Sequence, residues 1–118
     1  PEQVVVLKEK NGHRQIPIVI GFMEATSIQM RIAGAEARRP LTHDLLAQVV
    51  QLMGAEVERL VIDDLSEGTF YAKLRVKNTI NGLVDVDCRP SDGIALAVRI
   101  AIPIFVDERV FLKSSAPQ

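Results

Sequence analysis

The sequence predicts a single compact domain over residues 1–118, of the α/β class with a mixed sheet (an α+β arrangement), in which antiparallel hairpins surround a buried helix at residues 92–102. Three observations predict this class. An apolar helix directly follows an alternating strand, other alternating stretches come in pairs separated by turns, and 47% of the 118 residues are hydrophobic. A chain of this length and composition can bury one core.

The predicted central helix lies within the stretch VDVDCRPSDGIALAVRIAIPIFV, residues 84–106. Alternating valines and aspartates indicate a strand, and Ser91 is expected to cap the helix that follows. Only Arg99 interrupts the apolar residues of this helix, so neighbours on all sides should bury it. Pro103 is expected to end it, and Ile104–Val106 to form a short apolar strand.

The N-terminal stretch Gln3–Ile20 predicts a hairpin. Asn11-Gly12 favours a tight type I′ turn, which places Leu7 opposite Ile16 on an apolar face. Pro17 falls on the other face and cannot donate to a strand ladder. The second strand of this hairpin should therefore lie at a sheet edge or carry a bulge.

Two amphipathic helices are predicted next. The first covers Phe22–Ala33, and the second runs from a cap at Thr42 to a C-terminal glycine at Gly54. The positions expected to face the core are Met23, Ile28 and Ile32 in the first helix and Leu45, Leu46, Val49, Val50 and Met53 in the second.

Three further strands are predicted at residues 57–65, 69–77 and 83–89. If the last two form a hairpin, Arg75 faces Asp85 and Lys73 faces Asp87 across it. Val84, Val86 and Cys88 then share the face directed at the core. Residues 107–112 are expected to add a helical turn, and residues 113–118 to form a frayed tail.

Composition excludes several classes of protein. A net charge of −1 and a sequence pI near 6.2 give no global basic excess for phosphate binding. There is no membrane-length apolar run, and the single cysteine, Cys88, is expected to be an inert core residue, so a cytoplasmic location is predicted. No Walker loop, GxGxxG, GxSxG, HExxH or paired CxxC is present, which weighs against the standard nucleotide, hydrolase and zinc sites.

Acidic and imidazole side chains offer two candidate sites. Asp85 and Asp87 project from one strand face and could hold a divalent cation, although pairing with the opposite basic residues is the favoured explanation. Thr42, His43 and Asp44 begin a helix; capping explains Thr42 and Asp44, but it does not explain His43, which could serve as a base or a ligand.

Arginines supply the candidate phosphate contacts. Arg38 and Arg39 lie in a predicted loop, and Arg89 lies beside a helix N-terminus, which is itself an anion site. Arginine also holds carboxylates, so Asp92 could instead be the partner of Arg89 or Arg39 in an internal clasp.

Four stretches resemble the bifunctional nuclease domain family: IPIVIGFMEA (16–25), RPLTHDLL (39–46), EGTFYAKL (67–74) and DCRPSDGIALAVR (87–99). The resemblance spans almost the whole chain, and it departs from the expected pattern at Cys88 and at Gly93, where alanine would be usual. It implies a single α/β domain, a tendency to self-associate, and metal-dependent nuclease activity on DNA and RNA. The polar positions that match are Glu24, Arg39, Thr42, His43, Asp44, Asp87, Arg89, Ser91 and Asp92.

A nuclease needs an activated water and charge neutralisation at the scissile phosphate. For the reaction that the resemblance implies, we assign roles by residue chemistry. Catalytic roles fall to His43, Asp44 and Asp92, with His43 as the base; substrate contacts fall to Arg39, Arg89 and Ser91; and Asp44, Asp87 and Asp92 are the expected ligands of Mg²⁺ or Mn²⁺.

Two other functions remain open at this stage. The chain could be a non-enzymatic oligomeric or regulatory module whose RPSD (89–92) and THD (42–44) residues form a structural clasp. A weaker option is small-anion binding at Ser91 and Asp92, although the Asp92 carboxylate would repel an anion. The nuclease hypothesis implies nucleic acid as a partner, no membrane, and a homo-oligomer.

Overall fold

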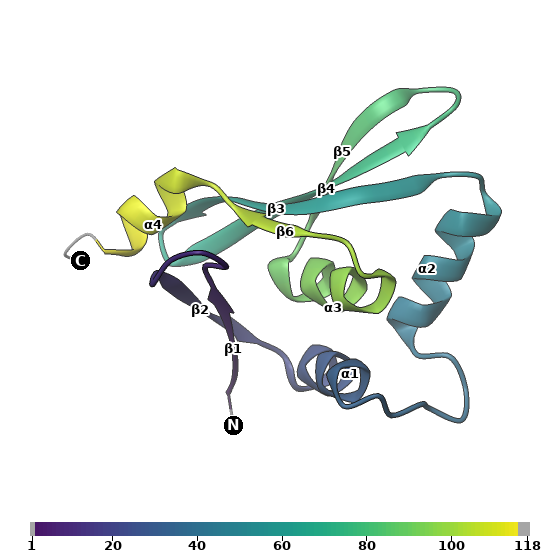
Figure 1. Ribbon diagram of the computed structural model, residues 1–118, viewed down its shortest axis with the longest axis horizontal. Coiled ribbons are helices and arrows are strands. Elements are labelled where there is room, and N and C mark those ends of the chain that lie inside the picture. The colour runs from purple at the N-terminus through teal and green to yellow at the C-terminus, as the bar shows by residue number, and fades with distance from the viewer. Residues whose placement is uncertain (1, 116–118) are drawn as a thin grey trace.

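The computed structural model describes residues 2–115, which contain six strands and four helices (Figure 1). In chain order these are β1 (Gln3–Lys8), β2 (Gln15–Ile20), α1 (Phe22–Ile32), α2 (Thr42–Leu52), β3 (Glu56–Ser66), β4 (Thr69–Asn78), β5 (Gly82–Cys88), α3 (Pro90–Ile100), β6 (Ile104–Val106) and α4 (Glu108–Ser114). They form a single compact α+β domain, as the sequence predicts.

The strands form two sheets. β1 and β2 make an antiparallel pair, and the larger sheet has the order β5-β4-β3-β6, in which β6 runs parallel to β3 and the other neighbours are antiparallel. The larger sheet is therefore mixed, as predicted. No helix within residues 2–115 is both long enough and apolar enough to cross a membrane.

Helix α3 is the buried centre of the domain. Figure 1 shows it packed between the larger sheet and α1, with α2 beside its C-terminal end. The side chains of Ile94, Ala95, Leu96 and Ala97 are each about 1% exposed. The predicted central helix is thus confirmed, because an apolar residue on every side of the helix meets a sheet, a hairpin or another helix.

The ends of α3 differ from the prediction. Arg89, in an extended conformation, is the N-cap, and Pro90 occupies the first helical turn, where its missing N–H costs nothing. Ser91 is therefore inside the helix and is not its cap. The helix ends at Ile100 because Ala101 adopts a left-handed conformation (φ 58°), two residues before Pro103.

Helix α2 turns a different face to the core than predicted. Leu45, Leu46, Val49 and Met53 are 57%, 40%, 47% and 79% exposed, and only Val50 of the predicted set is partly buried. The inward positions are His43, Ala47 and Val50, which follow one another at helical spacing. In α1, Ile28 is buried as predicted, but Met23 and Ile32 are about three-quarters exposed.

The tight turn occurs in a different hairpin from the predicted one. Neither Asn11 nor Gly12 has a positive φ, so the β1–β2 loop is not of type I′, although Leu7 does pair with Ile16. The two-residue turn with positive φ at both positions is instead Glu67-Gly68, between β3 and β4. β2 pairs only with β1, which explains how it accommodates an exposed proline.

The β4–β5 hairpin confirms the predicted register but not the predicted burial. Arg75 pairs with Asp85 and Lys73 with Asp87. Val84 and Val86 are 36% and 44% exposed. Figure 1 shows the reason: the tip of this hairpin extends away from the helices, so only the part of β5 next to α3 is covered.

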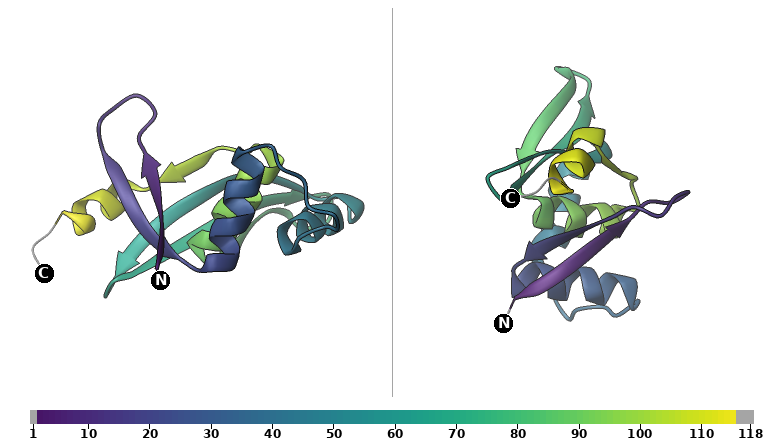
Figure 2. Two further views of the ribbon diagram at one scale, coloured as in Figure 1. Left: turned by 90° about the horizontal axis from the view of Figure 1, so that it is seen from below. Right: turned by 90° about the vertical axis from the view of Figure 1, so that its left-hand side faces the viewer.

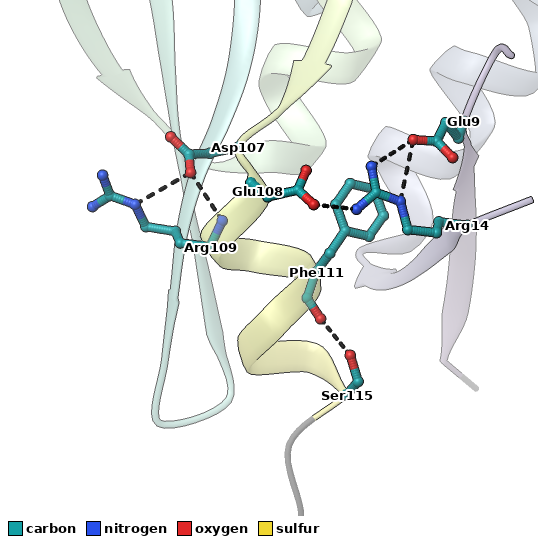
Figure 3. A network of polar contacts seen from close by, with 7 residues as sticks. All are labelled: Glu9, Arg14, Asp107, Glu108, Arg109, Phe111 and Ser115. Carbon is teal, nitrogen blue, oxygen red and sulfur yellow. Dashed lines mark hydrogen bonds and ion pairs between the residues drawn. The ribbon is translucent and has the colours of Figure 1, made fainter. Parts of the chain in front are cut away.

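Helix α4 is attached to the β1–β2 loop by Arg14 (Figure 3). The guanidinium of Arg14 donates to Glu9 (2.6 Å) and Glu108 (2.5 Å) and lies 4.1 Å above the Phe111 ring. Figure 2 (left) shows the hairpin and α4 toward the same end of the molecule, opposite α2. The predicted helical turn is confirmed and extends through residues 113–114 of the predicted tail, whereas residues 116–118 lie outside the described part of the chain.

Replacing Gly93 with alanine should destabilise the domain. An added Cβ would lie 2.6 Å from Leu60 Cδ1 and 3.1 Å from Cys88 Sγ, and Leu60 is fully buried. We expect this crowding to lower the free energy of unfolding by about 1–3 kcal/mol, outweighing the ~1 kcal/mol that alanine gains in helix propensity. Urea unfolding measures the change, and Leu60→Val, which removes a methylene, should reduce it in the double variant. A Gly93→Ala protein at least as stable as wild type would contradict the packing described.

Candidate functional site

Three of the four stretches that carry the family resemblance border one cavity of about 370 Å³. Its walls are residues 17–21 from the end of β2, residues 68–70 from the β3–β4 turn and the start of β4, and residues 89–91 from the start of α3. The fourth stretch begins α2 and reaches the same region through His43. The fold thus brings together segments that are up to about 70 residues apart in the sequence.

Arg89 lies at the wall of this cavity and holds two carboxylates. It donates from Nη2 to Glu24 Oε1 (2.7 Å) and from Nε to Asp92 Oδ2 (3.0 Å). The hydrogen bonds to Asp92 and then to Glu24 raise the pKa of Arg89, so it stays fully charged. Its side chain is 69% exposed, whereas that of Glu24 is 13% exposed. Arg89 can therefore meet a ligand from solvent while Glu24 anchors it to α1.

Asp92 connects this pair to α2. Its second oxygen, Oδ1, accepts a hydrogen bond from His43 Nε2 (3.1 Å), and His43 is almost fully buried. Because a carboxylate only accepts hydrogen bonds, Nε2 carries the hydrogen. We call Glu24, Arg89, Asp92 and His43 the Arg89 network; it joins the first turns of α1, α2 and α3.

The N-terminus of α3 adds a positive electrostatic potential to the same place. The first amides of an eleven-residue helix have no partner within it and favour an anion. Ser91, a predicted substrate contact, is buried at this end and lines the cavity. The exposed parts of the network are therefore one guanidinium and the carboxylate of Asp92, beside a helix N-terminus.

The other predicted site residues lie elsewhere. Asp44 accepts hydrogen bonds from Arg99 and from the backbone N–H of Leu41 (2.8 Å). Asp87 is 78% exposed on the sheet face, 3.5 Å from Lys73. Neither of them shares a partner with Asp92.

No group of three histidine, cysteine, aspartate or glutamate side chains that could hold a metal ion is present in residues 2–115. The predicted ligands Asp44, Asp87 and Asp92 are not brought together, so these residues do not fit a metal bound by three protein side chains. Mg²⁺ often uses only one or two carboxylates plus substrate phosphates, and Glu24 and Asp92 are the two carboxylates beside Arg89.

Sequence reasoning missed two members of these arrangements. Glu24 matches the family stretch, but the sequence indicates no role for it, because its partner Arg89 is 65 residues away. Arg99 is the one charge in the apolar run 94–102, and this interruption is the signal that could have identified it. Arg39 lies near Arg99, at a different cavity from Arg89.

Cys88 should be unreactive at neutral pH. Burial, with smaller contributions from Asp87 and Asp92, raises the pKa of this thiol to about 11. At pH 8 we therefore expect alkylation by iodoacetamide to be roughly a hundredfold slower than for a free thiol, since only the thiolate reacts. Mass spectrometry over time measures this rate, with the urea-unfolded chain as the reference. Equal rates in the folded and unfolded chains would contradict the predicted protection.

Comparisons with known proteins identify relatives over nearly the whole chain. Residues 5–118 match the family model of the bifunctional nuclease domain. An uncharacterized protein of Mycobacterium tuberculosis is 42% identical over 113 residues, which make up 96% of this chain and 66% of that protein.

Plant proteins are also similar. Bifunctional nuclease 1 of Arabidopsis thaliana is 29% identical over 111 residues, and bifunctional nuclease 1 of Oryza sativa subsp. indica is 29% identical over 115 residues. The chain spans about two thirds of the mycobacterial protein and 34% of each plant protein.

Proposed function

The chain belongs to the bifunctional nuclease domain family, and from this premise we propose that it hydrolyses phosphodiester bonds of DNA or RNA at the Arg89 network. The observation that supports this site most is that three of the four family-like stretches border one cavity and the fourth joins the charged side chains beside it through His43. The names of the plant relatives support the reaction class.

In the proposed reaction Arg89 contacts a non-bridging oxygen of the phosphate, helped by the amides at the start of α3. Asp92 is the exposed carboxylate of the network. It takes a proton from the attacking water while the water oxygen bonds to phosphorus. The bond to the leaving oxygen breaks, and that oxygen takes a proton from solvent. His43 is a positioning residue, because it is buried and orients Asp92.

Dependence on Mg²⁺ or Mn²⁺ is part of the proposal. A bound ion would neutralise charge on the phosphate. The assay should therefore compare Mg²⁺, Mn²⁺ and chelator, and it should use labelled single- and double-stranded DNA and RNA, because no substrate preference is assigned.

Replacing Arg89 with glutamine should lower kcat/KM at least about tenfold, because the phosphate loses a charge-assisted contact. Arg75→Gln is the matched control, since Arg75 is an arginine paired with an aspartate on the sheet, outside the network. Steady-state cleavage of a labelled strand measures both variants. Equal losses would show that Arg89 acts only through general charge.

A structural clasp is the second candidate function of the same residues. Arg89 bonds both Glu24 and Asp92, and His43 is buried, so the network also ties three helices together. In that case the chain is a non-enzymatic oligomeric or regulatory module. Purified protein without hydrolytic activity on any of the substrates, with every metal, would favour this function.

Self-association, which the family resemblance implies, is also proposed. It is supported by five exposed apolar side chains, four on α2 and one at its C-cap: Leu45, Leu46, Val49, Leu52 and Met53. Light scattering after size exclusion should give a mass at least twice that of the 13.0 kDa chain. A monomer mass at high concentration would contradict this. A cytoplasmic location stays a prediction.

A further inference from the structure

A second cavity, of about 430 Å³, is lined mainly by polar side chains of the α1–α2 loop and the neighbouring helices. Four of its lining residues are arginines: Arg31, Arg38, Arg39 and Arg99. We call it the arginine cavity. Glu36 and Asp44 are the acidic residues of its wall, so the lining carries two more positive than negative charges on a chain whose net charge is −1. Such a local excess attracts anions.

Arg99 lacks a hydrogen-bond partner for part of its guanidinium. Its side chain is 12% exposed, and its Nε donates to Asp44. Its Nη1 is buried and has no hydrogen-bond partner within the described residues. A buried donor of a charged group is costly to leave unpaired. An anion in the cavity that Arg99 lines would supply the missing acceptor.

The other three arginines have no protein partner among residues 2–115. No ion pair or side-chain hydrogen bond of Arg31, Arg38 or Arg39 is present there. A planar guanidinium can bind two phosphate oxygens through two parallel N–H donors. No carboxylate of the described residues occupies these donors in Arg31, Arg38 or Arg39. No aromatic residue lines the cavity, so it offers no platform for stacking a base.

We propose that the arginine cavity binds the phosphate group of a phosphate ester. This goes beyond the proposed hydrolysis, because the cavity uses none of the Arg89 network. Arg89 and Arg99 are ten residues apart on α3, which is roughly 15 Å at the rise of a helix. The ester can be a terminal phosphate or an internal phosphodiester of a nucleic-acid strand; both present the same oxygens to the arginines.

Amide chemical shifts of ¹⁵N-labelled protein provide the test. The protein is titrated, in chelator so that binding is measured without turnover, with inorganic phosphate and with a short single-stranded DNA carrying or lacking a 5′-phosphate. We expect shifts centred on residues 31, 35–39, 44, 47, 48, 99 and 100. Tighter binding of the 5′-phosphorylated strand identifies a terminal phosphate, and equal binding of the two strands identifies the internal diester.

The matched variants separate a built site from general charge. Arg38→Gln with Arg39→Gln should weaken binding at least about tenfold and lower the salt slope by about two. Lys8→Gln with Lys77→Gln removes the same charge from two exposed strand positions and should change binding less than about twofold. Equal weakening in both pairs, shifts centred elsewhere, or no binding of any probe would overturn the proposal. Phosphate binding in the arginine cavity is compatible both with hydrolysis at the Arg89 network and with its absence. Each proposal can therefore be contradicted without the other.

Discussion

Replacing Leu96 with alanine is expected to lower the free energy of unfolding by about 2–5 kcal/mol. Leu96 is 1% exposed in α3 and also lines a cavity with Ala47 and Val50 of α2. The loss has two parts: the hydrophobic burial of the deleted side-chain atoms is lost, and a cavity is left behind. Alanine has a high helix propensity, so propensity does not add to the loss. For a domain of this size such a loss is a large part of the total stability.

Leu112→Ala is the matched control for Leu96→Ala. It makes the same substitution in a helix, but Leu112 is 68% exposed in α4. We expect its effect to be within about 0.5 kcal/mol of zero. Urea unfolding followed by circular dichroism measures both. Similar losses for the two variants would show that α3 is no more buried than α4, and would contradict the architecture.

Replacing Asp92 with asparagine is expected to reduce the rate of phosphodiester cleavage at least about a hundredfold. The substitution keeps the shape of the side chain and an oxygen that can accept from Arg89, but it removes the group that takes the proton. Asp85→Asn is the control, since it removes the same charge from an exposed strand position paired with Arg75. Its rate should stay near that of wild type.

Single-turnover cleavage of a labelled strand separates the two aspartates, because it reports the chemical step and not product release. Both variants are compared at equal concentrations of folded protein. A hundredfold loss confined to Asp92→Asn supports the proposed base. A wild-type cleavage rate in Asp92→Asn would show that Asp92 does not act as the base in the reaction.

The fold was predictable where a local sequence pattern is compatible with only one structural arrangement. The run Ile94–Ile102 is apolar on all sides, which only a central position satisfies, and the turn between β4 and β5 set the register that pairs Arg75 with Asp85. The face of α2 was not predictable in this way. Apolar residues cover more than half of its circumference, so periodicity alone could not show that His43, Ala47 and Val50 face the core.

The candidate site was predictable only in its local part. Arg89 and Asp92 are three residues apart at a helix start, and the sequence indicated that they could pair. The contacts to Glu24 and His43 depend on how α1 and α2 cross α3, which no spacing in the sequence reports. The predicted link of Asp44 and Arg39 to the same site failed to appear because Arg99 holds Asp44 at the arginine cavity.

The cleavage rate per folded molecule of His43→Ala, measured together with its free energy of unfolding, distinguishes a catalytic role of the Arg89 network from a purely structural one. Removing a buried imidazole should destabilise the protein in either case, so stability alone does not decide. If His43 orients a catalytic carboxylate, the folded fraction of the variant cleaves at least about tenfold more slowly than wild type. A folded fraction that cleaves at the wild-type rate would show that the Arg89 network only holds the helices together.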